Sequence, residues 1–179
     1  MAAWAAARYH AAMPNAIVIT MSDSRSAGRA TDESGPAAAE CLRGIGLTVV
    51  EIQVVPDEAP DIAAAVRAAT GRAPVVVTTG GTGIGVRDVT PEALRPMFDK
   101  ELPGFGEIMR VGSFSKTPLS IISRGGAGLV GRSLVVYLPG SPRGVRECLE
   151  LVGPAMLHVL KVLTGPGVSC AEIAPQVGS

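Results

Sequence analysis

The sequence predicts an α/β fold in which helices cover both faces of a mostly parallel sheet. Hydrophobic residues make up 47% of the chain and aromatic residues only 3%, so small aliphatic side chains must pack the core. Short β-branched runs alternate with segments of helical periodicity, which is typical of crossovers between parallel strands. The 179 residues fit one domain. We expect it over residues 14–164, with a flexible leader over 1–13 and a flexible tail over 165–179.

The first half of the chain supplies three predicted strands separated by two helices. The run NAIVITM, residues 15–21, is a short strand of the type that is buried on both faces. LTVVEIQVV, residues 47–55, and PVVVTTG, residues 74–80, are the next two strands. Apolar residues recur at helical spacing between them: Ala38, Leu42 and Ile45 in the first helix, Ile62, Val66 and Ala69 in the second.

The second half alternates in the same way. Thr90, followed by Pro91, is predicted to cap a helix, and Pro103 to open another. SIISRG, residues 120–125, and SLVVYLPG, residues 133–140, are predicted strands joined by a glycine-rich connection. The last helix has one apolar face, formed by Val145, Leu149, Val152, Met156, Leu160 and Leu163.

Charge and cysteine content exclude several classes of protein. Sixteen basic residues balance sixteen acidic ones, so we expect the protein to bind neither nucleic acid nor an anionic membrane surface. The opening segment lacks a charged leading region, and its longest uncharged run stops at Arg8, which predicts a cytoplasmic protein. The three cysteines form no C-x-x-C pair, which argues against disulfides and zinc. Cys41 and Cys148 are expected to be small buried side chains.

A glycine-rich loop after the third strand is the first candidate for a functional site. The stretch TTGGTGIGVRDVTPEAL, residues 78–94, leaves the carboxyl end of a strand, where ligands usually bind in open parallel sheets. It is not a Walker A loop, because Val86 and Arg87 stand where a lysine and a hydroxyl are required. A formal G-x-G-x-x-G match at residues 126–131 precedes a strand, so it offers no helix terminus to a pyrophosphate.

The loop nevertheless contains the parts of an anion site. Glycines let the backbone approach a ligand and direct N–H groups toward it, and threonine hydroxyls add donors. A helix that begins at Thr90 would add partial positive charge. The alternative interpretation is a turn that only requires positive φ angles. The candidate ligand-binding residues of the loop are Thr79, Gly80, Gly81, Thr82 and Gly83.

Two aspartates strengthen the functional interpretation. Asp57 follows the second strand and Asp88 lies in the loop after the third, so a parallel sheet brings both carboxylates to one edge. Carboxylates beside a phosphate repel it unless a cation intervenes, and Mg²⁺ is commonly bound by one or two carboxylates together with substrate phosphates. Each aspartate alone is more often a turn or cap residue. As a pair they predict a magnesium site.

The segment LPGSPRGV, residues 138–145, provides a further candidate site at the same edge. Ser141 is a plausible helix N-cap, which would be a purely structural role. The same arrangement presents a helix N-terminus to an anion or a polar ring. Two such sites on one edge indicate a two-part substrate.

These motifs together resemble the MogA/MoaB family of molybdopterin-binding proteins. TTGGTG is followed by RDVTPEA, with SDSR and PDE before them and PGFGE and LPGSP after them. The separate motifs occur in the family's order. The resemblance covers residues 15–164, nearly the whole predicted domain.

The resemblance implies a three-layer α/β molybdopterin-binding fold that assembles as a homotrimer. In the active branch of the family, adenylate passes from Mg-ATP to the terminal phosphate of molybdopterin and pyrophosphate is released, before a partner inserts molybdate. The resemblance implies catalytic and Mg²⁺-binding roles for Asp57 and Asp88, and a phosphate-holding role for residues 79–83. The other substrate-binding residues that it implies are Ser22, Ser123, Pro139, Gly140 and Ser141.

Two alternatives of a different class remain open at this point. Some family members bind the pterin as non-catalytic carriers or assembly trimers, and these share most of the glycine loop. A generic nucleotide-binding α/β enzyme is the other alternative, and it requires the resemblance to be accidental.

Overall fold

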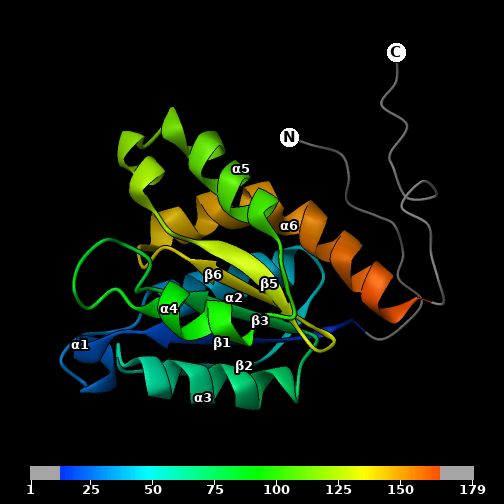
Figure 1. Ribbon diagram of the computed structural model, residues 1–179, viewed down its shortest axis with the longest axis horizontal. Coiled ribbons are helices and arrows are strands. Elements are labelled where there is room, and N and C mark those ends of the chain that lie inside the picture. The colour runs from blue at the N-terminus through cyan, green and yellow to red at the C-terminus, as the bar shows by residue number, and fades with distance from the viewer. Residues whose placement is uncertain (1–12, 166–179) are drawn as a thin grey trace.

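A six-stranded sheet forms the centre of the protein. The computed structural model describes residues 13–165, shown in Figure 1. The strand order is β2-β1-β3-β6-β5-β4. Strands β2, β1, β3 and β6 run parallel, β5 runs antiparallel to β6, and β4 runs antiparallel to β5. The strands are β1 (Asn15–Met21), β2 (Thr48–Val55), β3 (Val75–Thr79), β4 (Lys100–Glu101), β5 (Gly126–Val130) and β6 (Ser133–Leu138). The predicted α/β class with a mostly parallel sheet is confirmed.

Helices cover both faces of the sheet, so the domain has three layers. On one face lie α2 (Ser34–Gly44), α5 (Pro103–Phe114) and α6 (Pro142–Thr164). On the other lie α3 (Ala59–Thr70) and α4 (Thr90–Leu94) (Figure 1). The remaining short elements are α1 (Asp23–Ser26), η1 (Arg95–Met97) and η2 (Pro118–Ile122).

Alternation along the buried strands explains the two cores. In β1, Ala16 and Val18 belong to the core beneath α2 and α6, whereas Ile17 and Ile19 belong to the core beneath α3. All four side chains are fully buried. A strand that is apolar on both faces requires helices above and below it, and the sequence supplies them.

The last helix forms as its apolar spacing predicts. Val145, Leu149, Val152, Met156 and Leu160 are buried along α6. The Ser141 side chain accepts a hydrogen bond from the Gly144 N–H at 3.1 Å, so the predicted N-cap is confirmed. This cap fixes the point at which the helix leaves β6.

Two predictions in the second half are wrong. SIISRG is not a strand: η2 ends at Ile122 and an irregular segment follows. The predicted glycine-rich connection is instead the strand β5. A Cβ on Gly126 would lie 2.6 Å from the Tyr137 hydroxyl, and one on Gly128 would lie 2.4 Å from the Phe98 ring. Aromatic rings therefore occupy the space that side chains on this strand would fill.

The predicted leader and tail, 1–13 and 165–179, fall almost entirely outside the described residues. Across residues 13–165, no helix combines the length and the apolar character needed to cross a membrane. Cys148 is buried, as expected, and Cys41 is half-buried.

Candidate active site

Three parallel strands end around Gly80, and this point is the centre of the candidate site. Gly80 has a φ of 97°, and a Cβ there would lie 2.4 Å from the carbonyl oxygen of Met21 at the end of β1. Its N–H donates to the Leu138 carbonyl at the end of β6 at 3.1 Å. A Cβ on Gly140 would in turn lie 3.2 Å from the Gly80 Cα. Only glycine fits this junction, because the backbone has a positive φ and the neighbouring strand ends leave no room for a Cβ.

The next glycines make room for the two predicted carboxylates. Gly81 has a φ of 63°, and a Cβ there would lie 3.4 Å from Asp57 Oδ1. A Cβ on Gly83 would lie 2.7 Å from Asp88 Oδ2, the same oxygen that accepts the Gly85 N–H at 2.8 Å. The glycine loop therefore lies between Asp57 and Asp88, as the sequence predicts.

Thr90 departs from its predicted role. It is the first residue of α4 and not the cap, which is Val89 and makes no side-chain cap bond. The Thr90 hydroxyl donates to the Gly80 carbonyl at 2.9 Å, and its N–H donates to the Gly81 carbonyl at 3.0 Å. Because α4 has five residues and its first N–H is already used, it adds little to an anion site.

Asp57 is held by Asp23, a residue that the sequence analysis did not single out. The Asp23 N–H donates to Asp57 Oδ2 at 3.0 Å, and the Asp57 N–H donates to Asp23 Oδ1 at the same distance. Ser22, just before it, caps α1 by accepting the Arg25 N–H. The reciprocal pairing fixes the Asp57 side chain at the edge of the glycine loop. Asp23 lies within the quoted SDSR motif, which is the signal that could have identified it.

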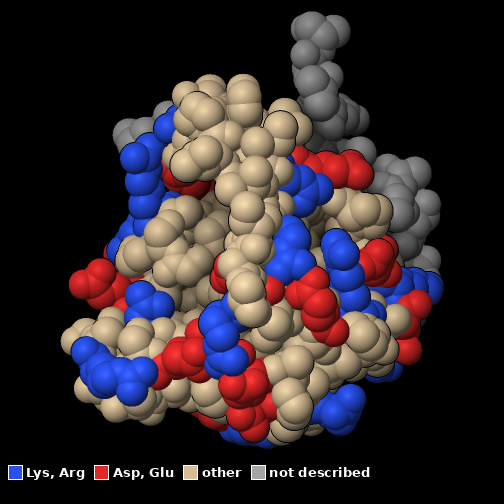
Figure 2. All heavy atoms as spheres, turned by 60° about the vertical axis from the view of Figure 1, so that its left-hand side comes forward, with Lys and Arg blue, Asp and Glu red and all other residues tan. Residues whose placement is uncertain are grey.

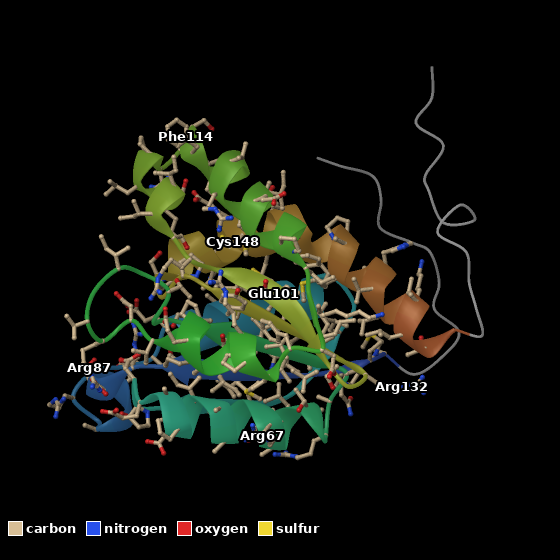
Figure 3. The ribbon with its side chains drawn as sticks, in the orientation of Figure 1. Arg67, Arg87, Glu101, Phe114, Arg132 and Cys148 are labelled. Atoms are coloured by element: carbon tan, nitrogen blue, oxygen red, sulfur yellow. The ribbon has the colours of Figure 1, made fainter. Side chains whose placement is uncertain are left out.

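The pKa values of the paired carboxyls move in opposite directions. Burial raises the pKa of Asp57, the Asp23 N–H acts against this, and the charges of Asp23 and Asp88 raise the pKa further. The pKa of Asp23 is lowered, chiefly by the Asp57 N–H and also by Arg87. Arg87 binds Asp23 with its Nε at 3.0 Å and Glu58 with an NH2 at 2.8 Å. Figure 3 places Arg87 at the edge of the molecule beside α1.

Thr79 connects the start of the glycine loop to α2. Its side chain is fully buried and its hydroxyl donates to the Ser34 hydroxyl at 2.9 Å. Ser34 and Thr20 both donate to the carboxylate of Asp32, at 3.0 and 2.8 Å. Thr79 therefore anchors the strand end to α2 through its hydroxyl. Thr82 is also buried.

A pocket of about 410 Å³ opens next to the glycine loop, between α5, η2 and the amino end of α6. Ser123, Pro139 and Ser141 line it, so candidate residues from two separate segments of the sequence share one cavity. The sequence analysis missed the residues that α5 contributes, among them Arg110 and the buried Ser113. Figure 3 shows Cys148 below α5, where it forms part of the lining. Burial raises the pKa of its thiol to about 11, so it stays protonated.

Asp57 and Asp88 are the residues that could hold a magnesium ion together with substrate phosphates. Within residues 13–165 no group of three or more His, Cys, Asp or Glu side chains could enclose a metal ion. Mg²⁺ does not need such a cage, because it keeps water and substrate phosphates among its ligands. Asp57 and Asp88, on either side of the glycine loop, supply the oxygen chemistry that it prefers.

Fold and site together define a class of protein. It is the class of three-layer α/β proteins whose ligand site lies at the carboxyl edge of a parallel sheet. The family described as "Probable molybdopterin binding domain" matches residues 17–158. The chain belongs to this family.

Relatives of known name agree with this membership. The molybdopterin adenylyltransferase of Helicobacter pylori strain J99 is 41% identical over 152 residues, which are 83% of this chain and 86% of that protein. A molybdenum cofactor biosynthesis bifunctional protein of Chlorobaculum tepidum is 42% identical over 164 residues, 90% of this chain. The chain spans about half of that protein, 51% of its length.

Solved structures extend the agreement to the fold. The molybdopterin biosynthesis enzyme MoaB of Thermus thermophilus matches with a TM-score of 0.80 and 42% identity, covering 86% of this chain and 98% of that one. The tungsten cofactor synthesizing protein MoaB of Pyrococcus furiosus matches with a TM-score of 0.79 and 37% identity, over 86% and 98%. The predicted molybdopterin-binding fold is therefore confirmed.

Proposed function

We propose that this protein is a molybdopterin adenylyltransferase that acts in molybdenum cofactor biosynthesis and uses Mg-ATP. One observation carries the proposal: the pocket and the carboxylate-flanked glycine loop are contiguous, because Gly140 packs on Gly80 while its neighbours Pro139 and Ser141 line the pocket. A pterin ring bound in the pocket would therefore place its phosphate beside the glycine loop. The names of the relatives support the same activity.

The proposed reaction depends on the positioning of the two reacting phosphates more than on proton transfer. An oxygen of the pterin phosphate attacks the α-phosphorus of ATP, a new P–O bond forms, and the bond to the β-phosphate oxygen breaks to release pyrophosphate. The attacking phosphate is already ionised, so no general base is needed. Bound Mg²⁺ would neutralise phosphate charge, and Asp57 and Asp88 would hold it. Backbone N–H groups of the loop orient the phosphates, and the pocket fixes the pterin.

The assay that tests the proposal combines molybdopterin and Mg-ATP with wild type, Asp88→Ala and Asp88→Asn. The alanine variant loses both the charge and the acceptor for the Gly85 N–H, whereas asparagine keeps an acceptor. We expect both variants to lose ~10²–10³ in turnover, because charge stabilisation is the shared loss. Formation of adenylylated pterin and pyrophosphate is the readout.

Asp99→Asn is the matched control. Asp99 also accepts a glycine N–H, at 2.6 Å, but its partner Gly131 lies in the turn between β5 and β6, away from the candidate site. Its turnover should match the wild type. A loss below about tenfold in both Asp88 variants contradicts the catalytic assignment. Tight pterin binding by a wild type that forms no product would favour the non-catalytic carrier instead.

We further propose that the protein works as a cytoplasmic homotrimer and passes adenylylated molybdopterin to a molybdate-insertion partner. The trimer and the partner rest on the family resemblance. Consumption of ATP favours the cytoplasm as the compartment. Substrate-binding roles for Ser22, Ser123 and the residues of the glycine loop belong to the same proposal.

A further inference from the structure

Arg124 binds the glycine loop at both of its ends. Its N–H donates to the Thr82 carbonyl at 2.8 Å and its Nε donates to the Gly83 carbonyl at 2.7 Å. One NH2 group donates to the Asp88 carbonyl, and the other nitrogen binds the Glu92 carboxylate. One side chain therefore joins the residues that enter the loop to those that leave it.

Only an arginine can make this set of contacts. A guanidinium offers five N–H donors in a fixed plane, whereas a lysine offers all its donors from one nitrogen. The Arg124 side chain is 32% exposed, so its bonds to the two carbonyls are partly shielded from water. Glu92 is 55% exposed, and ion pairs of that kind contribute little. The contacts to the carbonyls are thus the ones that fix the loop.

The same segment forms a wall of the pocket. Ser123, adjacent to Arg124, lines the pocket. From the pocket side, Arg110 donates to the Ser123 and Gly125 carbonyls at 3.4 and 3.3 Å. Residues 123–125 are held by α5 independently of Arg124. Loss of the Arg124 side chain should therefore increase the mobility of the glycine loop and leave the pocket wall in place.

We infer that Arg124 is the positioning residue that sets the loop carrying Asp88 against the pocket. It touches no reacting atom in this scheme. It acts through the carbonyls of Gly83 and Asp88, which determine where the Asp88 carboxylate and the loop N–H groups stand relative to the pterin phosphate. This inference rests on the proposed adenylyl transfer for its kinetic consequence, but its structural content does not depend on it.

The kinetic test compares Arg124→Met with the wild type. Residues that orient metal-binding side chains commonly cost about 10- to 100-fold in activity when replaced, and we expect that loss in kcat. The KM for molybdopterin should stay near its wild-type value, because Arg110 still holds the pocket wall. A variant that is merely less well folded would lose pterin binding together with turnover.

Two further variants distinguish the carbonyl contacts of Arg124 from the effect of its charge alone. Arg124→Lys keeps the charge but cannot reach three acceptors, so it should be as impaired as Arg124→Met. Glu92→Gln removes the ion pair and leaves the carbonyl contacts, so it should retain most of the turnover. Rescue by lysine combined with a large loss in Glu92→Gln would overturn the inference.

A structural readout completes the test. Hydrogen exchange followed by mass spectrometry should be faster over residues 83–88 in Arg124→Met, and unchanged over α5 and η2. Arg72→Met is the control, because Arg72 pairs with Glu51 near the opposite edge of the sheet. If wild type forms no product but exchange accelerates in Arg124→Met, the transferase fails and the positioning role stands. If wild type forms product and Arg124→Met matches it in rate and exchange, the positioning role fails.

Discussion

At the scale of single residues, Asp57 combines a proposed role in holding Mg²⁺ with an electrostatic cost. Its carboxyl is half-buried beside Gly81, and burial together with the charges of Asp23 and Asp88 raises its pKa. A folded-state pKa above the unfolded value means that ionisation opposes folding. The stabilisation exists in acid, where the group is protonated, and is lost as the pH rises through the folded-state pKa. Above its folded-state pKa the ionised Asp57 therefore costs stability, as perturbed groups at functional sites often do.

Asp57→Asn is predicted to melt at a higher temperature than the wild type at pH 7 and to lose ~10²–10³ in turnover. Calorimetry at pH 7 and again in acid checks the first part, since the difference should shrink as Asp57 becomes protonated. The gain should be small because the side chain is partly exposed. Asp61→Asn, on the exposed face of α3, is the control and should show no such gain. A lower melting temperature for Asp57→Asn at pH 7 contradicts the prediction.

The sequence predicts the acidic and glycine residues of the site but not the arginines that hold them. Asp57, Asp88 and Gly80 follow strands, and parallel strand ends meet at one edge, so their proximity follows from the topology. Arg124 binds the carbonyl of Gly83 across 41 positions of the chain. Any exposed arginine could make such a contact, and only the folded backbone shows which carbonyls are within its reach.

At the scale of elements, β5 shows where local propensity fails. Glycine disfavours strands, so the segment GAGLVG predicts a loop. In the structure Gly126 pairs with Tyr137 across the sheet, and the Phe98 ring lies over Gly128. The Phe98 and Tyr137 ring centroids are 6.1 Å apart. The two rings supply the buried area that the glycines lack, and this tertiary contact overrides the propensity. Strand β1 and helix α6 needed no such contact, because their own apolar patterns specify them.

Gly128→Ala is predicted to lower the free energy of unfolding by about 1–3 kcal/mol, because the new methyl group would overlap the Phe98 ring. Chemical denaturation monitored by far-UV circular dichroism measures the change. Gly44→Ala is the matched control: Gly44 is the last residue of α2 and a Cβ there meets nothing within 4 Å. That variant should be neutral or slightly more stable. Equal stability of both variants would show that the ring can move aside.

At the scale of the whole molecule, apolar side chains gather on the outer surface of α5 and η2. Figure 2 shows uncharged atoms at the top of the view, where these elements lie, and interspersed acidic and basic side chains below. Val111 is 73% exposed and Leu119 is 72% exposed. The other exposed apolar residues of this surface are Ile108, Phe114, Ile121 and Ile122. Large exposed apolar surfaces often mark interfaces, and we predict that further copies of the chain in the proposed homotrimer cover this one.

Val111→Asp is therefore predicted to break the assembly. Val111 lies on the outer side of α5, so the change introduces no charge into the core, and an aspartate buried between copies would lack a partner. Light scattering should give a trimer for the wild type and a lower mass for Val111→Asp. Val162→Asp is the matched control: Val162 is an exposed valine near the carboxyl end of α6, outside the α5–η2 surface, and its mass should stay that of the wild type. A trimeric Val111→Asp protein would place the interface elsewhere, and a monomeric wild type would contradict the trimer itself. Because Leu119 also lines the pocket, an assembly through this surface would cover one side of the proposed pterin pocket, so Val111→Asp should weaken pterin binding along with assembly.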